Sequence, residues 1–273
     1  MNRQANDGYK WNPVMDVNPL LGGKNAAGKL TTLLEEAAGG KILGHDLTLY
    51  VRENARVWGM DNEYISSQAL DDLQCVWGCF RGFLNAAPSG DIPVFCALNS
   101  EEIGSRTTDG ADSTYVEDVL TRIAEGLHRN VREMLSQSFL VSADNAHAIH
   151  PAHPEYADKG EFPVLGGGIV IKYNANQRYT TDGVSAALFR QACKKAGVPT
   201  QTFCNRADLA GGSTLGNISS SQVSIPTVDV GLPQLAMHSC YETAGARDAA
   251  YLVQAMSQVF SMHLTVSGCP SLS

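Results

Sequence analysis

The feature that most constrains the fold of this 273-residue chain is an alternation of short apolar runs with longer segments of helical periodicity. From residue 58 onward the pattern is regular: residues 68–84 place apolar side chains at helical spacing, and residues 93–98 form a short continuous apolar run. Such runs are typical of strands buried on both faces of a sheet, which helices then cover. The alternation predicts an α/β fold, a three-layer sandwich with a mainly parallel central sheet.

The rest of this region continues the alternation. We expect helices over residues 116–135, 182–196 and 248–262, and buried strands over residues 139–142, 168–173, 201–204 and 225–231. Gly197 and Pro199 follow the second of these helices and are a usual helix stop.

Residues 1–57 differ from this pattern. They begin with polar residues, continue into a short helix-like stretch at residues 30–38, and then alternate polar and apolar residues over residues 45–51, which predicts a half-buried strand. A piece of this size is too small to form a sound domain alone. We therefore expect it to belong to a larger unit, with a separate α/β domain over residues 58–273.

Composition excludes several classes of function. Hydrophobic residues make up 44% of the chain and charged residues 18%, so the chain has the material for a buried core. The net charge is −8 and no Lys/Arg cluster occurs, which argues against a nucleic-acid partner. No apolar run reaches the length of a membrane span, and the N-terminus lacks the apolar region of a secretory signal. The seven scattered cysteines indicate reduced thiols and a cytoplasmic protein.

Two adjacent glutamates, Glu101 and Glu102, directly follow the predicted strand that ends at Leu98. Chemistry in parallel α/β sheets collects at the carboxyl ends of the strands. Adjacent carboxylates repel each other, and a metal ion offsets that cost when one carboxylate binds it and the other serves as general base for a metal-bound water. A solvated acidic loop is the alternative interpretation.

Other acids and histidines occupy similar places. Asp71 and Asp72 open a helix, where acidic residues are also favoured by the helix dipole. Asp144 and His147 follow the second predicted strand, and His238 follows the last one. Histidines of this kind are more often structural than metal ligands. Taken together, however, an Asp, a Glu–Glu pair, an Asp and a His at strand ends predict a dinuclear zinc site with a bridging carboxylate.

The motifs around these residues resemble those of the M18 aspartyl-aminopeptidase-like metallopeptidases, over about residues 40–262. The similar segments are S-Q-A-L-D-D-L at 67–73, E-E-I-G-S at 101–105, S-A-D-N-A-H-A-I-H-P at 142–151, I-K-Y-N-A-N-Q-R-Y at 171–179, G-S-T-L-G at 212–216 and P-Q-L-A-M-H-S at 233–239. The resemblance implies the three-layer fold of zinc peptidases.

The resemblance also implies roles for the metal-binding and catalytic residues. Asp71 would bridge two metal ions, Glu102 and His238 would complete one site, and Asp144 would serve the other. Glu101 would be the general base that takes a proton from the attacking water. The implied cofactor is Zn²⁺, two ions per active site in the family, with Co²⁺ or Mn²⁺ as alternatives.

Substrates and assembly follow from the same resemblance. Lys172 and His147 would help to position the substrate or the transition state, and the loop of Gly212, Ser213 and Thr214 would line the pocket. Family members remove N-terminal residues, acidic ones among them, from peptides. They assemble as homo-oligomers, dodecamers in particular.

One family motif has no counterpart here. An earlier strand of the family ends in A-H-T-D-S-P, and its His would be the last ligand of the Asp144 metal. We therefore expect residues 1–57 to be the C-terminal part of an inserted lid or dimerisation domain, and the catalytic domain to lack its N-terminal strands. One tight and one weak or absent metal ion would result. The alternative function is a truncated, catalytically incompetent homologue that acts as an assembly or interaction module.

Two smaller departures concern the helix that carries the bridging aspartate. Asp72 stands where the family has Asn, which adds a negative charge beside Asp71. Ala69 stands where the family has Arg.

Overall fold

The structure of the chain, a computed structural model, describes residues 8–88, 90–209, 211–267 and 269–272. By its internal contacts the chain divides into two compact units, one ending at Leu49 and the other beginning at Tyr50. The origin of the first region as part of an inserted lid remains a prediction.

The first unit contains a single turn of 3-10 helix, η1 (Lys24–Ala26), and one α-helix, α2 (Leu30–Ala38). The latter confirms the helix predicted there, and it ends at Gly39, whose left-handed backbone is the usual helix terminator. The strand predicted over residues 45–51 is wrong, because the segment has no strand pairing and the side chains of residues 45–50 are exposed. Alternation alone does not make a strand, because a strand also needs an edge to pair with.

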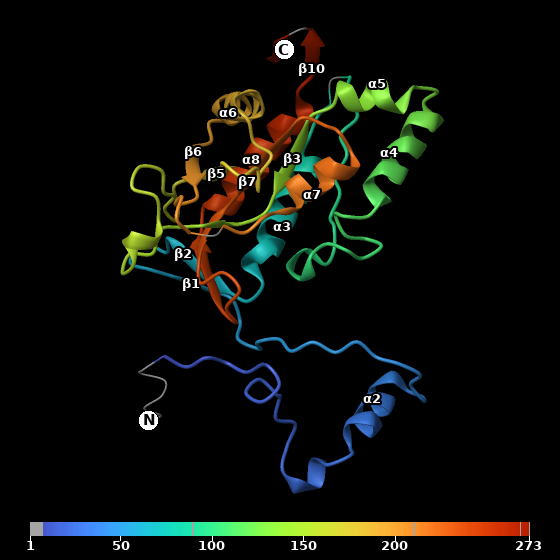
Figure 1. The fold of residues 1–273 in the computed structure, drawn as a ribbon, viewed down its shortest axis with the longest axis vertical. Helices are drawn as coiled ribbons and strands as arrows, with labels where there is room; N and C mark the ends of the chain where they lie inside the picture. The colour runs from blue at the N-terminus through green and yellow to red at the C-terminus, as the bar shows by residue number, and fades with distance from the viewer. Residues whose placement is uncertain (1–7, 89, 210, 268, 273) are drawn as a thin grey trace. The chain divides into compact units, whose positions relative to one another are not determined.

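The second unit is built on a four-stranded sheet in the order β3-β7-β5-β6 (Figure 1). Its strands are β3 (Leu140–Ala143), β7 (Thr227–Gly231), β5 (Ile169–Tyr173) and β6 (Thr200–Cys204), as the apolar runs predict. β3 pairs with β7, and β5 with β6, in parallel, whereas β5 and β7 are antiparallel. The two central strands are buried throughout, apart from a half-buried Tyr173.

Helices cover both faces of this sheet. α3 (Leu70–Leu84), α6 (Gly183–Ala196) and α8 (Asp248–Ser261) share one hydrophobic core with β5 and with Val228 and Val230 of β7. Because side chains alternate along a strand, Asp229 between them points to the opposite face, where it lies against Gly216 of α7 (Leu215–Gln222). The three-layer arrangement is thus confirmed.

α3 and α8 pack unusually closely. A Cβ added to Gly82 of α3 would lie 2.6 Å from the Cβ of Met256 in α8. The missing side chain therefore lets the two helix backbones approach, which fixes the position of α3 and of the acidic residues at its first turn.

A second sheet, of five short strands in the order β1-β2-β9-β8-β4, was not predicted. Its strands are β1 (Arg56–Trp58), β2 (Tyr64–Ser67), β9 (Glu242–Gly245), β8 (Pro233–Leu235) and β4 (Ala146–His147). Only the pair of β4 and β8 is parallel. At two to four residues, these strands are too short to give a recognisable period.

Two predicted elements of the α/β region are wrong. Residues 93–98 are extended but form no strand with any described residue, and Phe95 instead packs on Phe80 of α3 at a ring distance of 5.5 Å. The helix predicted over residues 116–135 is two helices, α4 (Tyr115–Gly126) and α5 (Val131–Ser136). Asn130 caps the second one by accepting the backbone N–H groups of its first turn, which starts a new helix.

The remaining elements are short. They are two 3-10 turns, η2 (Glu101–Ile103) and η3 (Pro154–Tyr156), and a hairpin of β10 (Leu264–Ser267) and β11 (Cys269–Leu272). Within the described residues, no helix combines the length and the apolar character that crossing a membrane requires.

Candidate metal centre

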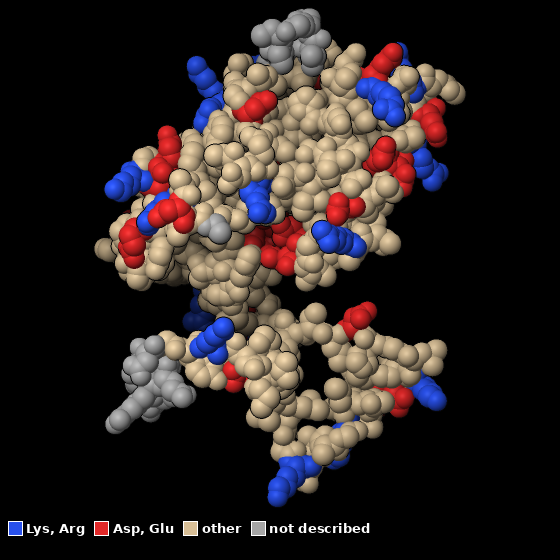
Figure 2. Space-filling view, in the orientation of Figure 1, with Lys and Arg blue, Asp and Glu red and all other residues tan. Residues whose placement is uncertain are grey.

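All ten residues that the sequence assigns to the site line one cavity of about 290 Å³ in the second unit. They are Asp71, Glu101, Glu102, Asp144, His147, Lys172, Gly212, Ser213, Thr214 and His238. Acidic side chains gather at a hollow in the surface of this unit (Figure 2). The cavity thus joins segments that lie up to 167 residues apart in the chain, from Asp71 to His238.

The first cluster of potential ligands consists of Asp71, Glu102 and His238. The Nε2 atom of His238 lies 3.2 Å from Oδ2 of Asp71 and 3.1 Å from Oε2 of Glu102. One imidazole and two carboxylates converging within these distances form a donor set that suits zinc. We call this set the histidine cluster.

The backbone around the histidine cluster adopts unusual conformations. Ala69, just before α3, has φ 53°, Ser100, just before Glu101, has φ 62°, and His238 itself has φ 64°. Left-handed backbone is uncommon for residues other than glycine and concentrates at functional sites, where the surrounding structure enforces it.

Glu242 of β9 supports the histidine cluster through hydrogen bonds to its backbone, and the sequence analysis did not identify it. Its Oε2 accepts the backbone N–H of Asp71 at 3.0 Å, and its Oε1 accepts the backbone N–H of His238 at 2.9 Å. The residue is only 2% exposed. One carboxylate therefore fixes the spacing of two segments that each supply a ligand.

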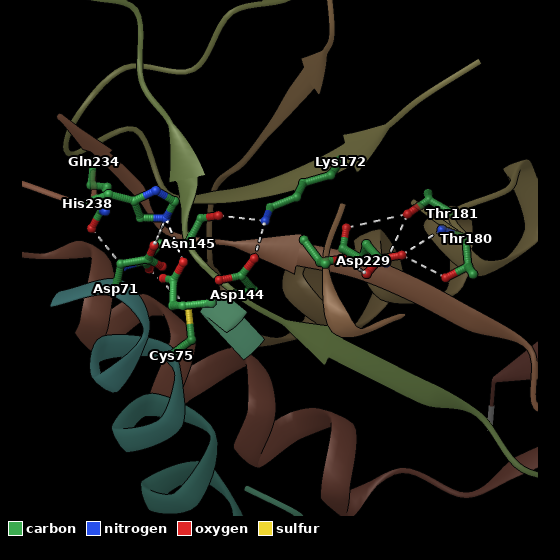
Figure 3. Close-up of polar contacts among 12 residues, drawn as sticks. Asp71, Cys75, Asp144, Asn145, Lys172, Thr180, Thr181, Asp229, Gln234 and His238 are labelled. Atoms are coloured by element: carbon green, nitrogen blue, oxygen red, sulfur yellow. Dashed lines mark hydrogen bonds and ion pairs between the residues drawn. The ribbon is translucent and has the colours of Figure 1, made fainter. Parts of the chain in front are cut away.

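A second cluster consists of Asp71, Asp72 and Asp144, whose ligand atoms also lie within 4.8 Å of one another. We call it the carboxylate cluster. Lys172 of β5 donates to Oδ2 of Asp144 at 3.3 Å and to the carbonyl oxygen of Asn145 at 2.5 Å (Figure 3). Its side chain is 3% exposed, so a buried ammonium group lies beside this cluster.

Two features of the chain fix the segment that carries Asp144. Asn145 donates from Nδ2 to the carbonyl oxygen of Leu70 and to Oε1 of Gln234, both at 2.8 Å, which ties the segment between β3 and β4 to the start of α3 and to β8. A Cβ on Gly231 of β7 would overlap the carbonyl oxygen of Asp144. Only glycine allows these two backbones to lie so close.

The donor atoms fit a cation. Oδ1 of Asp71 and Oδ1 of Asp72 are both buried and have no hydrogen-bond partner among the described residues. Buried carboxylate oxygens without a partner are costly, and nearly all buried polar atoms in proteins are satisfied. A divalent cation supplies what these atoms lack.

The acids shift one another's protonation. Burial, together with the negative charges of Asp144 and Glu102, raises the pKa of Asp71 to about 8. Burial, Asp144 and Glu102 likewise raise the pKa of Glu101 to about 7. Burial and then Asp144 hold the pKa of Asp72 well above its usual range. Such clustered shifts are typical of functional sites.

The predicted substrate-binding residues line the same cavity. Burial, together with the charge of Lys172, lowers the pKa of His147, so its imidazole is neutral at neutral pH. Buried Asp229 accepts a hydrogen bond from Oγ1 of Thr214 at 2.8 Å. It accepts another from Oγ1 of Thr180 at 2.7 Å (Figure 3). It thereby joins the loop ending at Thr214 to the loop that follows Tyr179.

The structure thus brings together every residue that the sequence singled out and adds three supports that it missed, Glu242, Asn145 and Asp229. Two of these had a sequence signal: Glu242 lies four residues after His238, and Asn145 directly follows Asp144. Asp229 had none, because it lies in the middle of an apolar run.

Comparisons with known proteins agree with this arrangement. The family model for aminopeptidase I zinc metalloproteases (M18) matches residues 9–260. A probable M18 family aminopeptidase 2 from Clostridium acetobutylicum is 38% identical, and the match covers 96% of this chain and 63% of that protein. The chain therefore spans less than two thirds of the length of this curated relative.

Solved structures show the same fold. A chain in the cryo-EM structure of the Ape4 and Nbr1 complex is 31% identical, with a TM-score of 0.81 over 95% of this chain and 55% of that one. The S. cerevisiae mApe1 dodecamer, at 24% identity, shares the fold with a TM-score of 0.75 over 90% of this chain and 59% of that one. Because the family model matches most of its length and the family motifs surround its cavity, the chain belongs to the M18 family of zinc metallopeptidases.

Proposed function

We propose that this chain carries the active site of a metal-dependent aminopeptidase, which releases N-terminal residues from peptides. The observation that carries the proposal is the shared cavity, in which Glu101 lies beside both clusters of potential metal ligands. Membership in the M18 family supports the same activity.

The metal ligands would be Asp71, Glu102 and His238 for one ion and Asp71 with Asp144 for a second. A bound Zn²⁺, or Co²⁺ or Mn²⁺, acidifies water and polarises a peptide carbonyl. The carboxylate of Asp71 belongs to both clusters, which suits it to bridge two ions.

Glu101 would act as the general base. It follows Ser100, whose left-handed backbone opens the 3-10 turn η2, and its carboxyl group lines the cavity. Its pKa of about 7 lies near physiological pH, where a group both accepts and returns a proton efficiently. It would take a proton from the attacking water and deliver it to the nitrogen of the leaving peptide.

The cavity has the charge that an aminopeptidase substrate needs. A free N-terminal amine is a cation, and Glu101 is the carboxylate of this cavity that the proposed ions would leave uncompensated. The neutral His147 has a ring nitrogen that can donate a hydrogen bond to a substrate carbonyl. Lys172 is paired with Asp144, so we assign it to orienting that carboxylate and, through it, the bound substrate. The loop of Gly212, Ser213 and Thr214 would line the pocket for the N-terminal side chain, acidic side chains among them.

We also propose that the protein works as a homo-oligomer in the cytoplasm. One structure with the same fold is a dodecamer, which supports assembly of this chain with copies of itself. All six cysteines whose side chains are described are free thiols, which fits a reducing compartment. The molar mass of the purified protein in solution tests the assembly.

The test of the activity is hydrolysis of short peptides by the metal-loaded protein. We expect release of the first residue from peptides with a free amine and none from N-acetylated copies. Glu101→Gln should lower kcat by about 10²- to 10⁴-fold, as loss of a general base does. The matched control is Glu117→Gln, an exposed carboxylate of α4.

Failure of the proposal would be easy to recognise. No hydrolysis by the metal-loaded wild type, or equal cleavage of acetylated peptides, would overturn it. Glu101→Gln with wild-type activity would remove Glu101 from its role. Parallel peptides that begin with Glu, Asp and Leu would measure the preference for acidic residues.

A further inference from the structure

The carboxylate cluster includes a residue that the proposed activity does not use, Asp72. We propose that Asp72 is a metal ligand, so that Asp71, Asp72 and Asp144 form an all-carboxylate site for an oxygen-preferring divalent cation such as Mn²⁺. This inference rests on the proposed metal centre and names the chemistry of its second half.

The geometry of the three acids is the first support. Each offers one carboxylate oxygen, and these three atoms lie within 4.8 Å of one another. Asp72 follows Asp71 directly at the start of α3, where both residues have non-helical backbone angles, so the two carboxylates come from adjacent positions of one kinked segment. Asp144 comes from the end of β3, held by Lys172 and by the close approach of Gly231.

Two oxygens without partners provide an independent support. The side chain of Asp71 is only 4% exposed, and its Oδ2 faces His238. Its Oδ1 has no hydrogen-bond partner among the described residues, and neither has the buried Oδ1 of Asp72. These two Oδ1 atoms are available to bind a cation, and the carboxyl group of Asp72 also interacts with the thiol of Cys75.

The charges around the carboxylate cluster also favour a bound cation. Lys172 donates to Asp144 of this cluster and also to the carbonyl oxygen of Asn145. When all three acids are ionised, one ammonium group cannot neutralise them, and like charges at such short range repel strongly. A divalent cation between the three acids restores the balance.

The donor set selects the kind of ion. Neither His nor Cys joins this group among the described residues, and the nearby thiol of Cys75 donates to Oδ1 of Asn145 at 3.1 Å. Carboxylate oxygens suit Mn²⁺, Mg²⁺ and Ca²⁺, whereas an imidazole suits zinc. Zinc should therefore enter the histidine cluster first and leave the carboxylate cluster to the harder ion.

The experiment titrates the metal-free protein with Mn²⁺ and counts bound ions by electron paramagnetic resonance, after one equivalent of Zn²⁺ has been added. We expect one Mn²⁺ per chain for the wild type. Asp72→Asn, which keeps the size and removes the charge, should weaken this Mn²⁺ by about 100-fold or more. The matched control, Asp61→Asn at an exposed carboxylate, should bind Mn²⁺ as the wild type does.

The contrary outcomes are specific. Unchanged Mn²⁺ binding by Asp72→Asn would overturn the proposal, because it would mean that Asp72 is a neutral acid that Asn replaces without effect. Absence of bound Mn²⁺ in the zinc-loaded wild type would overturn it as well, and this result needs no variant. Retention of the first Zn²⁺ by Asp72→Asn shows that the variant is folded.

Failure of this inference is distinguishable from failure of the proposed activity, because ion counting requires no peptide hydrolysis. If the protein hydrolyses peptides but Asp72→Asn binds Mn²⁺ as the wild type does, only the ligand role of Asp72 is overturned. Mn²⁺ binding that depends on Asp72, without hydrolysis, would overturn the aminopeptidase alone.

Discussion

The histidine cluster and the carboxylate cluster share Asp71 but differ in exposure and in the groups that hold them. In the histidine cluster, the side chains of His238 and Glu102 are 62% and 54% exposed. In the carboxylate cluster, the side chains of Asp71 and Asp144 are 4% and 15% exposed. One shared residue thus joins an open cluster with an imidazole to a more enclosed cluster made of acids.

The supports of the two clusters differ as well. Glu242 accepts the backbone N–H groups of Asp71 and His238, so an anion holds the histidine cluster. Lys172 donates to Asp144, so a cation holds the carboxylate cluster. The difference teaches that the two proposed ions need not be alike: a substrate would reach the open site, while the enclosed site would depend more on charge balance.

The largest effect should come from His238→Ala, which removes the only imidazole of the histidine cluster. Loss of a direct ligand should weaken zinc by more than the roughly 10–100-fold of an indirect change. Zinc content of the purified variant, measured by plasma mass spectrometry, checks this. Zinc content equal to that of the wild type would contradict the assignment of zinc to the histidine cluster.

A smaller effect is expected from Glu242→Gln. An amide keeps one oxygen acceptor in place of two, so one buried N–H, of Asp71 or of His238, loses its partner. An unpaired buried group costs about 1–3 kcal/mol of unfolding free energy. Zinc affinity should fall by about 10- to 100-fold, as for other residues that orient ligands, while Mn²⁺ binding at the carboxylate cluster falls less. Thermal unfolding and zinc titration measure the two effects, and an equal loss at both clusters would contradict this account.

A third effect, on stability and not on metal binding, is a pH dependence of the metal-free protein. The pKa of Asp71 is raised from 3.8 to about 8 in the folded state, so between these values the folded chain binds more protons than the unfolded chain. Its contribution to stability is therefore complete below about pH 4 and is lost as the pH rises toward 8. The melting temperature in chelator should fall over this range, and Asp71→Asn should flatten the fall. A melting temperature that rises with pH, relative to Asp71→Asn, would contradict the raised pKa.

Sequence alone predicted the parts of the fold whose periodicity is long enough to read. The strands β3, β5, β6 and β7 and the helices α6 and α8 follow directly from apolar runs and helical spacing. Residues 93–98 show the limit, because their apolar run predicts a buried strand but pairing depends on a neighbour that periodicity cannot reveal. The five-stranded sheet was missed because its strands are too short.

The grouping of the candidate site residues was predicted further than the fold, since these residues lie in compact motifs, and their metal-binding roles stay predictions. What the sequence could not reveal was how those motifs meet. Asp72 looked like a minor departure beside Asp71, and only its distance to Asp144 gives it a chemical meaning. Glu242 and Asp229 act through contacts that join distant segments, which no local pattern records.

The most direct test of the account is a crystal of the protein with one equivalent of Zn²⁺ and an excess of Mn²⁺, measured by anomalous diffraction at both absorption edges. We expect zinc bound by Asp71, Glu102 and His238, and manganese bound by Asp71, Asp72 and Asp144. Zinc divided equally between the two clusters, or a manganese ion that Asp72 does not contact, would contradict it.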